Sequence, residues 1–224
     1  MGRGARPGDR GGGCAARGVT PTFKHGSLLL YGEDVRHSLP LLPIEGWTRD
    51  RLHAAYYLAI TVFGRPVPVP PSLDYPDPED EFYGYARHPV RVAGGDVPST
   101  RDLIRVTGWM ATARLAHEAR QYVARKRDLP ALYARHIGDA WTDLLVTLDR
   151  RCRTEWGYLI PADRRGRLEL RAICQQVPAF ENDFLARYQR YLLADLAQGQ
   201  ERALRVMQRL PWDDPEVQRA LAHS

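Results

Sequence analysis

The sequence has no long run of apolar residues. Its apolar stretches fall well short of the roughly 20 residues that a helix needs to cross a bilayer. The N-terminal region is rich in Gly and Arg and has no apolar segment of the kind found in secretory signals. With 44% hydrophobic and 26% charged residues, the chain has the composition of a globular protein. We therefore expect a cytoplasmic location and no membrane partner.

Cysteine and the common catalytic motifs are also scarce. The three cysteines, Cys14, Cys152 and Cys174, form an odd set without C-x-x-C spacing, which argues against a disulfide framework and a zinc site. The sequence contains no G-x-S-x-G, no H-E-x-x-H, and no G-x-G-x-x-G after a strand. No two histidines lie four residues apart on a helix, so we expect no bound metal.

The formal net charge of +5 is unevenly distributed. Residues 1 to 22 contain one acidic residue, Asp9, and four arginines, which are Arg3, Arg6, Arg10 and Arg17. The rest of the chain is therefore close to neutral, whereas a surface for nucleic acid needs a clustered basic stripe. We expect nucleic acid not to be a partner. Residues 1 to 22 also have few large apolar side chains, which predicts a disordered tail.

Residues 23 to 98 combine three patterns. The apolar run from Leu28 to Tyr31, closed by Gly-Glu-Asp, predicts a strand or short extended segment. The stretch TRDRLHAAYYLAITVFG predicts a helix with Thr48 as its N-cap and Gly64 just past its end. Residues 65 to 98 are rich in proline, which disfavours regular elements, and predict an irregular loop. This loop contains four aromatic residues that can carry binding groups: Tyr75, Phe82, Tyr83 and Tyr85.

Residues 99 to 224 follow helical periodicity and predict a bundle of helices joined by short connections. Ser99 can cap a long helix that reaches about Lys126. Further helices are expected over residues 130–136, 140–155, 163–176, 178–198 and 200–209, and from Pro215 onward. The expected fold class is mainly α, a helical bundle with a short N-terminal extended segment and a proline-rich irregular loop.

One carboxylate falls on an apolar helix face. On a helical wheel, Glu181 lies near the middle of an arc formed by Phe180, Phe184, Leu185, Tyr188, Tyr191 and Leu192. A buried carboxylate is costly unless it is paired, protonated or used. Glu181 is therefore either a general base whose pKa is tuned by burial, or a structural residue paired with an Arg or Tyr. Its neighbours Asn182 and Asp183 point away from the arc and are expected at the surface.

Arginines flank the segment TEWGYLIPAD. Arg150, Arg151 and Arg153 precede it, and Arg164, Arg165 and Arg167 follow it. Cations are favoured near helix C-termini, so these side chains can be solvated helix ends. The alternative is a phosphate-binding rim, in which the forked guanidinium groups of Arg151 and Arg153 bind phosphate oxygens.

Four stretches together resemble one protein family: LLLYGEDVR (28–36), STRDLIRVTGWMATA (99–113), HIGDAWTDLLVTLDRRCRTEWGY (136–158) and AFENDFLARYQRYLLADL (179–196). They are similar to the helical domain that follows the catalytic core in bacterial nucleotidyltransferases of the aminoglycoside adenylyltransferase type. The resemblance implies a domain that helps form the cleft for the acceptor substrate and that, in some members, provides a carboxylate base. It implies Glu181 as that base, with Asp143 and Glu155 as alternatives. The side chains it implies for substrate binding are Trp141, Asp143, Tyr188, Tyr83 and Tyr85.

The chain departs from this family at the metal site. The family's core needs Gly-Ser, then roughly ten residues, then Asp-x-Asp, whose carboxylates hold magnesium ions. Here five residues separate Gly26-Ser27 from Glu33-Asp34, and the Asp-x-Asp is missing. We therefore expect the substrate-binding helical part of an enzyme that transfers a nucleotide to a small hydroxylated acceptor such as an aminoglycoside. It would be a truncated member or the partner of a separate catalytic chain, and inactive alone.

This interpretation places no cofactor in this chain; ATP and Mg²⁺ would come with a catalytic core. The expected partners are the small-molecule acceptor or the catalytic partner chain, and a homo-oligomer is a further possibility. The alternative is a non-catalytic helical module that binds another protein through exposed aromatic residues and Arg-rich helix ends. Such a module would expose an apolar patch of several hundred Å².

Overall fold

The computed structural model describes residues 18–223 and is mainly helical, as predicted. Its α-helices are α1 (Ile44–Val62), α2 (Arg101–Glu118), α3 (Leu129–His136), α4 (Thr142–Thr147), α5 (Arg164–Ala197), α6 (Glu201–Arg209) and α7 (Pro215–Ala222). A π-helix, Leu148–Glu155, continues directly from α4. Strands β1 (Pro89–Val92) and β2 (Gly95–Pro98) form an antiparallel hairpin.

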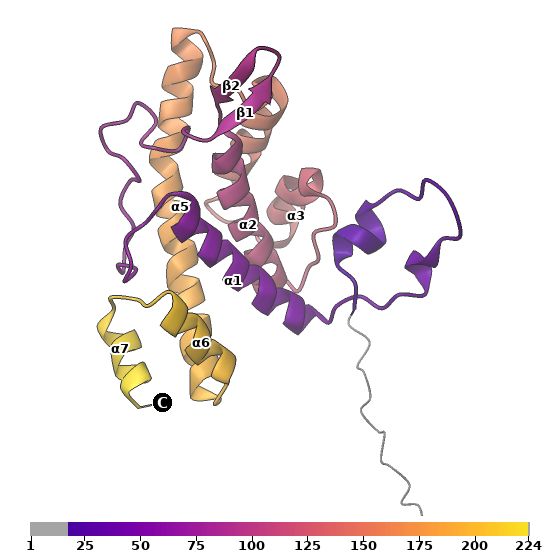
Figure 1. The fold of residues 1–224 in the computed structure, drawn as a ribbon, viewed down its shortest axis with the longest axis vertical. Helices are drawn as coiled ribbons and strands as arrows, with labels where there is room; N and C mark the ends of the chain where they lie inside the picture. Colours follow the sequence, from indigo (N-terminus) through magenta and orange to yellow (C-terminus); the bar gives the residue numbers. More distant parts are fainter. Residues whose placement is uncertain (1–17, 224) are drawn as a thin grey trace, which may run out of the picture.

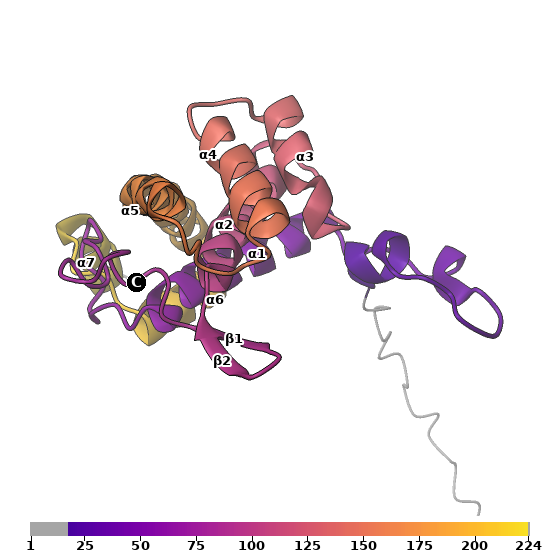
Figure 2. The same cartoon turned by 90° about the horizontal axis from the view of Figure 1, so that it is seen from above.

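Helix α2 is at the centre of the fold, where it contacts α1, α3, α5 and the π-helix (Figures 1 and 2). Helix α5 is the longest element, and its lower end in Figure 1 lies beside α6 and α7. One hydrophobic core joins residues from both predicted segments, 23–98 and 99–224. Leu52 and Tyr56 of α1, Met110 of α2 and Phe184 of α5 are all buried in it.

Helix α5 runs without interruption through Pro178, where the sequence predicts two helices. A proline inside a helix removes one backbone hydrogen bond and costs about 3 kcal/mol. The apolar face on both sides of Pro178 is buried, including Val177 and Phe180, so packing offsets this cost. The helix begins at the Asp163 N-cap, whose carboxylate accepts a hydrogen bond from the Gly166 N–H at 2.9 Å.

Of the two forms predicted for Leu28–Tyr31, a strand or an extended segment, the strand does not form. These residues have no regular structure, and the side chains of Leu28, Leu30 and Tyr31 are 84%, 93% and 97% exposed. They lie in an N-terminal arm, residues 18–43, which extends away from the helices in Figure 1. A strand needs a neighbour for its backbone groups, and the hairpin β1–β2, the one sheet within residues 18–223, does not pair with this segment.

The predicted disordered tail falls largely on residues 1–17, which lie outside the described part of the chain. Residues 18–22 are ordered. The Val19 N–H donates to the Pro40 carbonyl at 2.8 Å, and the Leu42 N–H donates to the Val19 carbonyl at 3.0 Å. Thr22 begins a short π-helix, Thr22–Gly26. Backbone hydrogen bonds therefore join the beginning of residues 18–43 to the end of this segment.

Helix α1 begins at Ile44, five residues before the predicted start, and Pro43 is at its N-cap position. Thr48 is not the N-cap. It lies in the first turns of the helix, and its hydroxyl donates to the Ala116 carbonyl of α2 at 3.0 Å. Thr48 therefore joins α1 to α2.

The proline-rich segment is irregular only as far as residue 88. Residues 89–98 then form the hairpin, which the sequence analysis did not predict. Pro89 and Pro98 face each other at its open end, and Ala93 and Gly94 form its turn. Gly94 and Gly95 have φ of 109° and 140°. Prolines are tolerated at strand ends because no ladder donor is lost there, and glycine adopts positive φ without strain.

The other helix predictions agree with the structure, apart from the two ends of α2. Thr100, not Ser99, is at its N-cap position. That helix ends at Glu118 rather than near Lys126, and residues 119–125 form an irregular linker. Helix α3, the combination of α4 with the π-helix, and α6 match the expected ranges. Helix α7 is capped by Asp214, whose Oδ1 accepts from the Glu216 and Val217 N–H groups at 2.8 and 3.2 Å.

Candidate anion-binding pocket

A pocket of about 500 Å³ opens beside α1 and α2. Helix α2 contributes one face to its wall, and the linker after α2 and the end of the π-helix, with Arg153 and Tyr158, also line it. The charged and aromatic side chains that line it are Trp47, Arg51, Arg101, Arg105, Trp109, Lys126, Arg153 and Tyr158. Its volume lies in the range of small-molecule sites.

The charged side chains of this wall are all cationic. They are Arg51, Arg101, Arg105, Lys126 and Arg153, and no aspartate or glutamate lines the pocket. Arg105 has a carboxylate partner outside the wall, because its Nη1 donates to Asp102 at 2.8 Å. Arg153 pairs in the same way with Asp149.

The other three cations lack such a partner. Arg51, Arg101 and Lys126 form no ion pair with any carboxylate of residues 18–223. Arg101 and Lys126 are exposed at the mouth of the pocket, and Arg51 is half-buried. Several like charges without counter-ions produce a positive potential inside a concave, low-dielectric site.

Helical spacing brings these side chains together. Trp47 and Arg51 are four residues apart on α1, and Arg101, Arg105 and Trp109 recur at intervals of four on α2. Residues at this spacing share one helix face. The pattern was present in the sequence, and a search for basic and aromatic residues at i, i+4 and i+8 would have found it.

Arg51 contacts both tryptophans of the pocket. Its guanidinium carbon lies 4.4 Å from the centre of the Trp47 indole and 5.0 Å from the centre of the Trp109 indole. These are cation–π distances. Burial lowers the pKa of Arg51, with the charge of Asp50 opposing the shift.

Arg153 is fixed by contacts with its neighbours. Its Nε donates to the Tyr158 hydroxyl at 3.1 Å, and its Nη1 donates to the Lys126 carbonyl at 3.3 Å. The phosphate-binding rim predicted as one alternative combines Arg151 and Arg153, but the structure separates them. Arg151 does not line the pocket; it pairs with Glu155 and Glu169.

Glu181 lies in the core, as its helical wheel predicts, and is 0% exposed. Its Oε2 accepts from Arg65 Nη2 at 2.8 Å and from the Tyr85 hydroxyl at 2.6 Å. Burial raises the pKa of Glu181, while the charge of Arg65 and the hydrogen bonds from Tyr85 and Arg65 act in the opposite direction. A carboxylate with no exposed surface and two internal partners favours the structural interpretation over the catalytic one.

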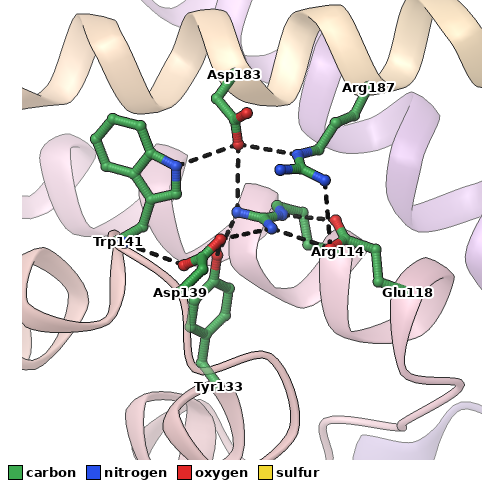
Figure 3. Close-up of polar contacts among 7 residues, drawn as sticks. All are labelled: Arg114, Glu118, Tyr133, Asp139, Trp141, Asp183 and Arg187. Carbon is green, nitrogen blue, oxygen red and sulfur yellow. Dashed lines mark hydrogen bonds and ion pairs between the residues drawn. The ribbon is translucent and has the colours of Figure 1, made fainter.

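A second internal cluster surrounds Arg114, which is 2% exposed (Figure 3). Arg114 forms ion pairs with Glu118 at 2.7 Å, Asp139 at 2.8 Å and Asp183 at 3.3 Å. The Tyr133 hydroxyl also bonds to this guanidinium. The cluster ties α2 to α3, to the connection before α4, and to α5 (Figure 3).

The expectation that Asn182 and Asp183 are ordinary surface residues is wrong. The Asn182 amide accepts from the Leu73 N–H at 2.7 Å and donates to the Leu73 carbonyl at 3.0 Å, which fixes the proline-rich segment on α5. Asp183 Oδ2 accepts from Trp141 Nε1 at 3.2 Å and from Arg187 Nε at 2.9 Å, as Figure 3 shows. Both side chains join elements that are distant in sequence.

The side chains predicted to bind substrate do not gather at one site. Trp141 belongs to the Arg114 cluster, and Tyr85 bonds to Glu181. Tyr83 is buried against Tyr75, with ring centres 4.4 Å apart. Tyr188 is 1% exposed and packs on Tyr56, whereas Asp143 is exposed.

Comparison of this chain with protein-family models, curated proteins and solved structures finds no match. Within residues 18–223, no helix combines the length and hydropathy needed to span a bilayer. That same part of the chain has no group of three or more His, Cys, Asp or Glu side chains placed to hold a metal ion. The pocket, with its cations and two indoles, is the candidate site.

Proposed function

We propose that the protein binds a small organic phosphate in the pocket between α1, α2 and the linker that follows α2. The observation that supports this most strongly is the wall of five cationic side chains without a carboxylate. Guanidinium groups bind phosphate oxygens through two parallel N–H donors, and an ammonium group adds a mobile point charge. A bound phosphate would supply the counter-charge that Arg51, Arg101 and Lys126 lack.

The nucleotidyltransferase interpretation of the sequence is also a proposal, and it names two ligands, a nucleotide and an aminoglycoside. The charge of the pocket favours the nucleotide. An aminoglycoside carries several positive charges, and a wall of like charge disfavours it in this pocket. The phosphates of a nucleotide have the charge that suits the wall. Our proposal is therefore binding of the phosphorylated compound, without a catalytic step in this chain.

Calorimetric titration with ribose 5-phosphate at low salt tests the proposal. We expect saturable one-to-one binding that weakens as salt is added, because three of the cations, Arg101, Arg105 and Lys126, are exposed. The double variant Arg101→Gln/Lys126→Gln should bind at least about tenfold more weakly, since one charge-assisted hydrogen bond contributes about 1.5 to 3 kcal/mol. The matched control is Arg135→Gln, because Arg135 is exposed on α3 and does not line the pocket. Equal affinity in all three proteins, or no binding, would contradict the proposal.

The N-terminal arm supports a second candidate function, a protein-binding module. Leu28, Leu30 and Tyr31 expose nearly all of their apolar surface. Such a cluster favours association with another chain. Sedimentation of the wild type and of Leu28→Ser/Leu30→Ser over a range of concentrations tests whether that chain is a second copy. Association that is lost in the variant would support self-association, and a monomer at every concentration would exclude it.

A further inference from the structure

Helix α2 presents two rows of residues to the pocket. One row contains the cations Arg101 and Arg105. The other row has no charge and consists of Ile104, Gly108 and Thr112, which also recur at intervals of four. The Thr112 hydroxyl donates to the Gly108 carbonyl at 2.7 Å, so its proton is used within the helix. The second row therefore gives the pocket a mostly apolar surface beside the cations.

The apolar surface continues on the elements around α2. Val90 of β1, Trp109 of α2 and Ala124 of the linker line the pocket and are each partly exposed. Leu129, the first residue of α3, lines the pocket next to Gly108. A ligand group that covers these residues would remove apolar surface from water, which is favourable in proportion to the area covered.

Gly108 leaves space in this apolar surface. Glycine inside a helix is less favourable than alanine, and close packing does not require it here. Within residues 18–223, a Cβ at Gly108 would have one neighbour within 4 Å outside the local helix backbone, the Leu129 Cδ2 at 3.6 Å. That is an ordinary van der Waals distance. The missing side chain therefore widens the pocket between Gly108 and Leu129, because both residues line it.

The wall has many hydrogen-bond donors and few acceptors. Side chains of arginine, lysine and tryptophan donate and do not accept. The other polar side chains that line the pocket from residues 18–223 are the hydroxyls of Thr22, Thr112 and Tyr158, without a carboxylate, amide or imidazole. The Tyr158 hydroxyl already accepts from Arg153 Nε at 3.1 Å. An organic group rich in O–H or N–H donors, such as a sugar, would therefore lose the acceptors that it has in water.

We propose that the organic group of the ligand is a hydrocarbon, so that the ligand is a phosphate monoester of a small apolar alcohol. This inference rests on the proposed function and names the class of its ligand. The phosphate lies at Arg101, Arg105 and Lys126, and the hydrocarbon extends along α2 to Gly108 and Trp109. The helical rise places Trp109 about 12 Å beyond Arg101 along the axis of α2, which gives room for a short chain.

Calorimetric titration of the wild type with three phosphate monoesters tests the hydrocarbon. Hexyl phosphate, ribose 5-phosphate and AMP each carry one phosphate group, and only hexyl phosphate has an organic group without donors. We expect hexyl phosphate to bind at least about tenfold more tightly than the other two, the effect of two or more buried CH₂ groups. Equal or weaker binding of hexyl phosphate would overturn the hydrocarbon while the proposed function stood. No binding of any of the three would contradict the proposed function itself.

The length of the chain is a second test on the wild type. Burial of one CH₂ group tightens binding by about fourfold, so hexyl phosphate should bind at least about tenfold more tightly than butyl phosphate. The phosphate is the same in both, so this ratio measures the chain alone. Equal affinity for the two esters would show that the added methylenes stay in water, and it would overturn the inference.

Gly108→Leu locates the chain. The added side chain should fill the space beside Leu129 and weaken hexyl phosphate binding by at least about tenfold, since the chain then loses two or more buried CH₂ groups. The matched control is Gly108→Ala, whose Cβ fits at 3.6 Å from the Leu129 Cδ2 and which should bind hexyl phosphate as the wild type does. Circular dichroism shows whether each variant is folded.

Unchanged hexyl phosphate affinity in a folded Gly108→Leu variant would overturn the placement of the chain beside Gly108. If this variant does not fold, the ratio of hexyl to butyl phosphate affinity in the wild type still decides whether a hydrocarbon is buried.

Discussion

Two groups of arginines in this protein differ in how their charge is neutralised. Arg65 and Arg114 are 7% and 2% exposed, and each forms ion pairs with carboxylates inside the helical body. Arg51 and Arg101 line the pocket and have no carboxylate partner within residues 18–223. Buried charges persist only when they are paired. The first group therefore stabilises the fold, whereas the second is free to neutralise a charge brought by a ligand.

The largest effect is expected at Glu181. Glu181→Ala leaves Arg65 buried without its counter-charge and removes the acceptor for the Tyr85 hydroxyl. Breaking a buried pair in this way should lower the free energy of unfolding by about 4 kcal/mol, as measured by urea denaturation. A loss below about 1 kcal/mol would show that the pair does not anchor the fold.

The pH dependence of Glu181→Gln tests the same pair. Burial raises the pKa of Glu181 above its ordinary value of 4.5. Between pH 4.5 and the raised pKa, Glu181 is therefore protonated in the folded protein and ionised in the unfolded chain. The wild type should therefore lose stability relative to the Gln variant as the pH rises through this window, and gain nothing below it. Parallel stability curves for the two proteins across the acid range would contradict the raised pKa.

The Arg114 cluster should respond almost as strongly. Arg114→Met leaves Glu118, Asp139 and Asp183 facing one another, and their side chains are only 25% to 28% exposed. We expect a loss of about 3 kcal/mol in the free energy of unfolding. The matched control is Arg205→Met, because Arg205 also pairs with a glutamate four residues away but is 66% exposed. The control should lose less than about 0.5 kcal/mol. Similar losses in both variants would show that the buried Arg114 pairs stabilise the fold no more than an exposed pair does.

Removal of the pocket cations should have the smallest effect on folding. Arg51→Met loses two cation–π contacts of about 0.5 to 1 kcal/mol each. It also relieves the burial of an unpaired charge, so the two effects should nearly cancel. Thermal unfolding should place this variant within a few degrees of the wild type. A large loss of stability would assign Arg51 to the structural group.

The local patterns of the sequence were sufficient for most of the helices and for the burial of Glu181, because one helix face is encoded within a few turns. They could not identify Arg65 as its partner, since 116 residues separate the two. Proline content led to two wrong predictions, a helix break at Pro178 and an irregular loop over residues 89–98. Pro178 is inside α5 because tertiary packing overrides local preference there. Pro89 and Pro98 close a hairpin because a proline at a strand end costs no ladder hydrogen bond.

The pocket required information that no single segment contains. Its wall combines α1, α2, the linker after α2 and the region around Arg153 and Tyr158. The spacing of Arg101, Arg105 and Trp109 was visible in the sequence, but nothing in it shows that these residues face Trp47 and Arg51 on α1. The apolar run at Leu28–Tyr31 has the composition of a buried strand, yet it is exposed because residues 18–223 provide no sheet edge beside it.

The most direct test of the difference between the two groups is a nitrogen–proton spectrum of the arginine side chains during a titration with ribose 5-phosphate. We predict that the signals of Arg51 and Arg101 shift with the added phosphate, while those of Arg65 and Arg114 stay unchanged. Signals that do not move, or that shift equally in both groups, would contradict the claim that the pocket cations serve a ligand.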